Sequence, residues 1–418
     1  MDELDNQESN INAAIDYRQQ IQSRHNKNVI INKEILVEGC EHVRKVFPNS
    51  FDNDDFPMAL LRDFFVEKDI KESLSIQEVE EIINKEIKDE SHPLRVLFSD
   101  KDTVFDDFIS TGATRDYVNE INRACERLGF DLRDGVTCGV THEKIIQAEQ
   151  QTVFLTDASI INITSNLYLL AHRASKLLAK SIAFEEVKGN QYRLSNNLND
   201  YKKKLLENTE LQRQWDFFFA DHALNNKNPD IGEIVYVGDI HIQNCYFDMK
   251  ESMLLFVIGH EFGHHIAKHS SMEMGKQLPG DNFSMEHEAD IIASILTMDI
   301  GRKNDDFNFF AAANLGAFCI LKILDFNSRA YEILNRNQNS GKKDLYNDHP
   351  PIIDRLGMIR AYIKNYEYDE TSGNVILSLI DLFNDLMDFI WSNSFRFINT
   401  MKEAGMKSTE QNEKQWLP

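Results

Sequence analysis

The sequence predicts an α+β protein that is mostly helical and contains one small sheet. Apolar residues recur at three- and four-residue intervals over long stretches, such as residues 167–178 and 375–397, which is the periodicity of buried helices. Shorter β-rich runs at residues 152–155 and 234–243 predict the strands. With 418 residues, of which 42% are hydrophobic and 27% charged, the chain can bury one large core or two moderate ones.

Charge divides the chain into three predicted regions. Residues 1–150 hold more than half of the excess negative charge and predict an acidic, mainly helical N-terminal module. Within it, Ser75 precedes an amphipathic run and predicts a capped helix. Residues 151–405 are predicted to form the catalytic domain, and residues 406–418 a polar tail.

Local patterns predict the first elements of the second region. Residues 152–155 predict a short strand, and Thr164 or Ser165 is placed to cap a strong helix. Residues 234–237 and 240–243 flank a Gly-Asp pair and predict a hairpin or a single bulged strand. We expect this small sheet beside the functional helix, where an exposed edge could hold a peptide by main-chain pairing.

The most specific pattern is H-E-x-x-H at residues 260–264. On a helix, His260 and His264 lie one turn apart on the same face, so both imidazoles can reach one metal ion. Glu261 projects beside them and is placed to take a proton from an attacking water. The motif therefore predicts a zinc-dependent peptidase.

The context of the motif favours a buried active-site helix. An apolar run at residues 253–258 leads into it, and Gly259 and Gly263 leave room for close packing. The alternative is an ordinary amphipathic helix that happens to carry histidines. A third histidine ligand is disfavoured, because His269 lies five residues after His264 instead of six and no glycine stands at position 267.

A catalytic zinc ion needs a third protein ligand, which the next helical segment supplies. Glu286 and Asp290 are four residues apart and share a helix face. Glu286 is predicted to ligate the metal, with Glu288 as the alternative ligand. Asp290 is predicted to accept a hydrogen bond from a ligand imidazole. These carboxylates could instead be a solvated acidic start of the helix.

The two blocks resemble the gluzincin metallopeptidases of the HtpX and CaaX-prenyl-protease type, whose second motif is E-x-x-x-D. Residues 347–356 read Asn-Asp-His-Pro-Pro-Ile-Ile-Asp-Arg-Leu and resemble the H-P-P-x-x-x-R segment that follows in these families. The three blocks stand in the same order and cover only about residues 250–365. Within this clan the chain is more similar to the soluble phage-exclusion peptidases of the Lit type than to the membrane enzymes.

This resemblance implies a zincin-like catalytic domain with a Zn²⁺ cofactor and Glu286 as a zinc ligand. It also implies that His349 lies near the metal, either to stabilise the oxyanion or to act as a fourth ligand. Arg355 could pair with an active-site carboxylate or help to bind a carbonyl. The residues themselves leave two alternatives open: His349 could cap the helix that follows it, and Arg355 could form a surface ion pair.

Global features restrict the partners and the compartment. The net charge of −23 argues against binding to nucleic acid or to an anionic membrane surface. The five scattered cysteines predict free thiols in a reducing compartment. The most apolar stretch, residues 307–326, is interrupted by polar residues and predicts a core helix instead of a membrane span. The acidic start is unlike a secretory signal, so we expect a cytoplasmic protein.

The predicted function is hydrolysis of peptide bonds in a protein or peptide substrate by a regulated or defence protease. Its activating partner is not identified by the sequence. The alternative is a catalytically silent zinc-binding interaction protein. Structural zinc sites usually have four ligands and many cysteines, and no cysteine neighbours this motif. That composition and the presence of Glu261 favour the peptidase.

Overall fold

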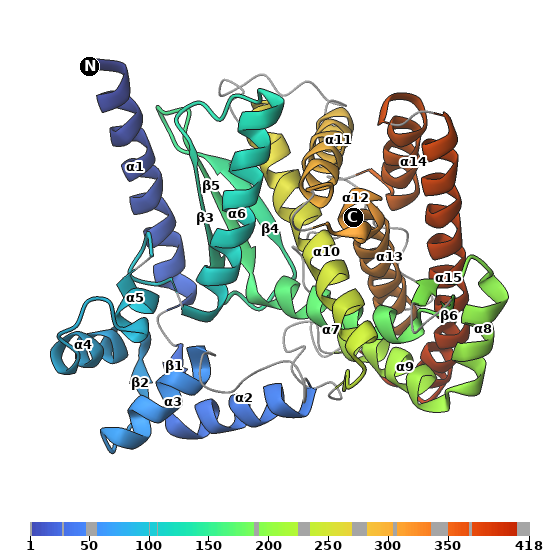
Figure 1. Cartoon of the computed structure of the whole chain (residues 1–418), viewed down its shortest axis with the longest axis horizontal. Helices are drawn as coiled ribbons and strands as arrows, with labels where there is room; N and C mark the ends of the chain where they lie inside the picture. Colours follow the sequence, from blue (N-terminus) through green and yellow to red (C-terminus); the bar gives the residue numbers. More distant parts are fainter. Residues whose placement is uncertain are drawn as a thin grey trace. The chain divides into compact units, whose positions relative to one another are not determined.

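The computed structural model of the chain describes residues 2–26, 29–46, 57–99, 101–106, 108–187, 192–224, 235–269, 282–303, 307–335, 350–367 and 370–407. This part of the chain is mostly helical and contains three small sheets, in agreement with the predicted fold class (Figure 1). It divides into two compact units. Unit 1 comprises Met1–Glu143, Ala148–Ser165 and Tyr236–Ile240, and unit 2 comprises Lys144–Gln147, Asn166–Val235 and His241–Pro418.

Unit 1 combines helices with short strands. Its helices are α1 (Asp2–His25), α2 (Lys33–Val46), α3 (Pro57–Glu67), α4 (Ile76–Glu86), α5 (Pro93–Ser99) and α6 (Phe108–Leu128). Its strands are β1 (Ile30–Ile31), β2 (Leu74–Ser75), β3 (Val136–Thr141), β4 (Ala148–Thr152) and β5 (Ser159–Thr164).

The three-stranded sheet of unit 1 has the order β3-β5-β4. The central strand β5 runs parallel to β3 and antiparallel to β4, and all of its residues are buried. Helices α1 and α6 pack against β3. The compact unit extends past the predicted boundary at residue 150, because β4 and β5 complete the sheet that β3 begins. The strand predicted at residues 152–155 is wrong for residues 153–155, because β4 ends at Thr152 and Leu155 turns the chain with a φ of 65°.

A buried polar network joins α1 to this sheet. The Arg18 guanidinium donates to both carboxylate oxygens of Asp106, at 2.7 and 3.0 Å, and to the Thr137 hydroxyl at 3.0 Å. Gln22 donates to the same carboxylate at 2.8 Å. A Cβ atom at position 139 would lie 1.7 Å from Arg18 Nη1, so any other side chain there would require this hydrogen-bonded guanidinium to shift. The buried charge is thus paired, as its desolvation requires.

The predicted helix start at Ser75 is confirmed. The Ser75 hydroxyl accepts a hydrogen bond from the Glu78 N–H, and the Glu78 carboxylate accepts one from the Ser75 N–H. This reciprocal pair is a capping box, which satisfies two backbone donors at the start of α4. Val79 and Ile83 are buried in a local apolar core together with residues of α2, α3 and α5.

Unit 2 is a helical assembly with one short hairpin. Its helices are α7 (Ser165–Ser181), α8 (Leu198–Glu207), α9 (Thr209–Leu224), α10 (Ile240–Ile266), α11 (Asn282–Gly301), α12 (Phe309–Ala312), α13 (Leu315–Asn335), α14 (Ile352–Tyr362), the π-helical turn η3 (Ile363–Glu367) and α15 (Glu370–Glu403). The hairpin pairs β6 (Phe184–Glu186) with β7 (Tyr192–Leu194).

The core of unit 2 contains aromatic side chains from three helices. Phe326 of α13 stacks on Trp391 of α15 with ring centroids 5.2 Å apart, and Phe219 of α9 meets the same indole edge-on at 5.4 Å. Residues 310–324 are buried throughout, as predicted for the apolar stretch 307–326, but this stretch forms two helices, α12 and α13, instead of one. In α15 the buried residues recur at three- and four-residue intervals, and the opposite face is exposed. No helix among the described residues is long and apolar enough to cross a membrane.

The prediction of a hairpin or a bulged strand at residues 234–243 is wrong. Residues 235–238 have no regular structure, and residues 240–243 are the first turn of α10, a single helix of 27 residues. Gln243, Tyr246 and Met249 are buried at three-residue intervals, which extends the apolar face of the motif helix upstream. Each added helical residue gains a hydrogen bond within its own segment, whereas a strand needs a partner. The peptide-binding edge expected from that pair therefore loses its basis.

Candidate metal centre

Helices α10 and α11 lie side by side and carry the predicted metal ligands (Figure 1). The Nε2 atoms of His260 and His264 are 3.1 Å apart. Glu286 approaches both, with Oε2 3.3 Å from His260 Nε2 and Oε1 3.4 Å from His264 Nε2. In a tetrahedral site with bonds of about 2.0–2.1 Å, neighbouring ligand atoms lie about 3.3 Å apart. These three side chains therefore form a group that could hold a metal ion.

A short chain of contacts orients the first imidazole. His260 Nδ1 lies 2.9 Å from Asp290 Oδ1, so its Nε2 is the nitrogen that faces Glu286. Arg355 of α14 donates to both oxygens of Asp290, from Nε at 2.8 Å and from Nη2 at 2.7 Å. All three side chains are buried. A carboxylate that fixes the second nitrogen of a ligand histidine sets its tautomer and its ring plane.

These contacts change the acidity of both partners. Burial alone would raise the pKa of Asp290, but Arg355 and His260 lower that pKa to about 2. Burial alone would lower the pKa of His260, but the hydrogen bonds to Asp290 and Glu286 raise it to about 9. These contacts therefore favour a positive charge at this position.

The second imidazole is oriented by a different route. His264 Nδ1 lies 2.8 Å from His269 Nδ1, and His269 Nε2 lies 3.1 Å from Glu288 Oε2. Glu288, the alternative third ligand, is thus directed to His269 and is absent from the donor group. The role of His269 is missed by sequence reasoning, which tests it only as a metal ligand. The nearby H-E-x-x-H motif is the one signal that points to this histidine.

The remaining predicted residues differ in how the structure places them. Glu261 is buried on α10 directly after His260. Burial lowers the pKa of Arg355, but the charges of Asp290, Glu286 and Glu261 together raise that pKa above its usual value. Arg355 pairs with Asp290 in the interior, so the alternative of a surface ion pair is wrong. His349 lies outside the described residues, and its predicted role near the metal stays a prediction.

Glycine permits the close approach of the two helices. A Cβ atom at Gly263 would lie 2.8 Å from the Cα atom and the carbonyl oxygen of Ala289 in α11. A Cβ atom at Gly259 would meet Ala293 Cα at 3.4 Å, an ordinary contact. Of these two glycines, Gly263 is the one that cannot be replaced without moving α11, because the backbone of Ala289 lies against it.

We expect Gly263→Ala to weaken zinc binding at least tenfold, because the methyl group pushes α11 and its Glu286 away from the histidines. Zinc affinity, measured by competition with a chromogenic chelator, checks this. Gly259→Ala is the matched control and should bind zinc like the unsubstituted protein. Equal affinities of Gly263→Ala and the unsubstituted protein would show that the helices can separate without moving the ligands.

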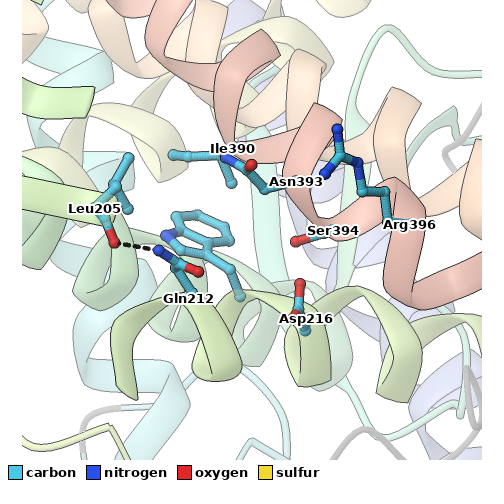
Figure 2. Close-up of a pocket in the computed structure, with 8 residues that line it drawn as sticks. Leu205, Gln212, Asp216, Ile390, Asn393, Ser394 and Arg396 are labelled. Carbon is cyan, nitrogen blue, oxygen red and sulfur yellow. Dashed lines mark hydrogen bonds between the residues drawn. The ribbon is translucent and has the colours of Figure 1, made fainter. Parts of the chain in front are cut away.

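A pocket of about 190 Å³ lies elsewhere in unit 2, between α8, α9 and α15 (Figure 2). Its lining is largely polar: Leu205, Gln212, Trp215, Asp216, Ile390, Asn393, Ser394 and Arg396. Burial raises the pKa of Asp216, while a hydrogen bond with Ser394 lowers it in part. None of the predicted site residues lines this pocket.

None of the five cysteines forms a disulfide. Cys40, Cys125 and Cys319 are buried, and none of the five belongs to the donor group.

No family model, no curated protein and no solved structure matches this chain.

Proposed function

We propose that this chain is a zinc-dependent peptidase that hydrolyses peptide bonds of a protein substrate, with a zincin-like domain built around α10 and α11. One observation carries the proposal. The ligand atoms of His260, His264 and Glu286 lie within 4.8 Å of one another, and the next residue along α10 after the first histidine is the buried carboxylate Glu261.

The donor set supports zinc and a catalytic site. Two imidazoles and one carboxylate are a ligand combination of catalytic zinc, which keeps a fourth position open for the reaction. Structural zinc sites are usually closed by four ligands, often cysteines. Within the part of the chain that the structure describes, the donor group has three members and no cysteine.

The proposed chemistry assigns a role to each side chain. Zinc held by His260, His264 and Glu286 would supply a Lewis acid for the scissile carbonyl and a lowered pKa for water. Glu261 would accept the proton of the attacking water and deliver it to the leaving amine. Asp290 would keep the Nδ1 proton of His260 in place, so that Nε2 stays directed at the metal position.

The biological setting is proposed from the resemblance and from composition. Similarity to the phage-exclusion peptidases favours a regulated protease that acts in defence and inside the cytoplasm, where free thiols persist. His349 is proposed to stabilise the oxyanion or to close the coordination sphere.

Replacing Glu286 with alanine should remove zinc and proteolysis together, because the variant loses one of three ligands. The loss of zinc affinity should exceed the 10–100-fold typical of removing an outer partner of a ligand. Elemental analysis of the purified protein measures the metal. A comparison of newly generated protein N-termini in cells that express each form measures proteolysis.

The matched control is His241→Ala, an exposed residue in the first turn of the same helix and outside the donor group. It should keep the zinc content and the cleavage products of the unsubstituted protein. Retention of zinc by Glu286→Ala would contradict the ligand assignment. An unsubstituted protein that binds zinc and generates no new N-termini would favour the catalytically silent interaction protein.

A further inference from the structure

We propose that His269 and Glu288 act as a positioning pair that fixes the tautomer and ring orientation of the ligand His264. The inference rests on the proposed function, because it assigns His264 Nε2 to the metal. It adds two residues that are not fixed positions of the H-E-x-x-H and E-x-x-x-D patterns, and it gives the second imidazole its own support. Neither residue touches the metal position or the substrate in this assignment.

The contacts form an unbroken line from the protein surface to the donor group. The Glu288 carboxylate is 61% exposed and lies 3.1 Å from His269 Nε2. The imidazole of His269 is 9% exposed, and its Nδ1 lies 2.8 Å from His264 Nδ1. His264 then presents Nε2 to Glu286 and to His260.

Only one arrangement of protons satisfies every contact and leaves a lone pair for a metal. If His264 Nε2 binds the metal, the neutral ring carries its proton on Nδ1 and must donate it to His269 Nδ1. His269 then has its own proton on Nε2, which donates to the Glu288 carboxylate. The reverse arrangement puts a proton on His264 Nε2 and prevents metal binding.

A turn of the backbone after α10 places His269 beside His264. Helix α10 ends at Ile266, and Lys268 adopts the left-handed conformation with a φ of 61°. A left-handed residue directly after a helix is a common way to end the helix and to turn the chain. The turn brings His269 back over the last turn of α10, with its ring centroid 5.0 Å from that of His264. The residue that makes this turn, Lys268, directly precedes His269.

The two ligand histidines therefore have unequal supports. His260 is held by Asp290, which is fully buried and paired with Arg355. His264 is held through a second imidazole by a carboxylate that faces water. Because water can replace part of an exposed contact, removing the Glu288 charge should have a smaller effect than removing the His269 ring.

Cobalt(II) titration of the full chain tests the pair, since cobalt(II) reports both affinity and ligand geometry through its visible absorption. His269→Leu should weaken cobalt affinity about 10–100-fold and change the absorption spectrum. Glu288→Gln should weaken it by up to about tenfold. In the His269→Leu background, Glu288→Gln should have no further effect, because the pair acts through one contact. His269→Gln should restore most of the affinity, because its side-chain carbonyl can accept the proton of His264.

The controls separate orientation from charge and from folding. Asp354→Asn removes an exposed negative charge from α14 of the same unit and should leave affinity and spectrum unchanged. Circular dichroism checks the fold, and Glu288→Gln alters an exposed side chain, so it tests the proposal even if His269→Leu misfolds. Affinity and spectrum that stay unchanged in folded Glu288→Gln, or in folded His269→Leu, would overturn the positioning pair alone. Absence of cobalt or zinc binding by the unsubstituted protein would overturn both this pair and the proposed function.

Discussion

Glu261→Gln should abolish proteolysis while the protein keeps its zinc. Glutamine preserves the size of the side chain and its buried position on α10 but cannot accept the proton of the attacking water. General-base catalysis contributes about 10²–10⁴-fold to the rate, so the new N-termini should disappear from cells that express the variant. The measurement pairs that N-terminal comparison with elemental analysis of the purified variant.

The two readouts of this experiment separate the base from the ligands. Glu261 is absent from the donor group, so its substitution should leave the metal content at the level of the unsubstituted protein. Cleavage at an undiminished rate would remove Glu261 from the mechanism. Loss of zinc from the variant would instead show that Glu261 supports the metal, and the base would have to be sought elsewhere.

Asp290→Ala should lower both the stability of unit 2 and the affinity for zinc. The substitution removes the bidentate acceptor of Arg355, a guanidinium that is only 1% exposed. Removing one partner of a buried ion pair costs about 3–5 kcal/mol. His260 loses the acceptor of its Nδ1 proton at the same time, which should weaken zinc binding about 10–100-fold. Urea unfolding followed by hydrogen exchange of α10 and α11 measures the first effect, and chelator competition measures the second.

A double variant distinguishes the two roles of Asp290. Replacing both members of a buried ion pair with apolar residues of similar size often restores stability. We therefore expect Asp290→Leu with Arg355→Met to recover most of the lost stability but none of the zinc affinity. Recovery of both would show that Asp290 acts on the fold alone and does not orient His260.

The same pair predicts the direction of the acid response. The pKa of Asp290 is about 2 in the folded chain, below its usual value of about 3.9 when unfolded. Its contribution to stability is therefore present above about pH 4 and is lost as the pH falls towards 2.

Local sequence patterns predicted the helices well, because helix formation depends on interactions within one segment. Ser75 and Glu78 form the capping box that their spacing indicates. The helix expected after His349 is α14, and its Ile352, Leu356 and Ile359 are buried at four- and three-residue spacing. In each case the partners lie within a few residues, so the pattern contains the contact.

Strands and compact units were predicted less well, because their partners are distant in the chain. Residues 240–243 have strand-like composition but form the first turn of α10. β3 and β5 are parallel and joined by a segment that includes β4, so their pairing cannot be read from either strand alone. Pairing is a property of tertiary structure, and it decides where unit 1 ends.

The identity of the donor residues was determined by the sequence, since H-E-x-x-H and E-x-x-x-D specify which side chains share a helix face. Only the packing of α10 on α11 decided that the nitrogen and oxygen atoms converge at distances of 3.1–3.4 Å. The supports behind the ligands also came from tertiary structure, because Arg355 and His269 reach the histidines from α14 and from a left-handed turn. Spacing along a helix fixes direction within one segment, whereas distance between segments depends on which side chains fill the space between them.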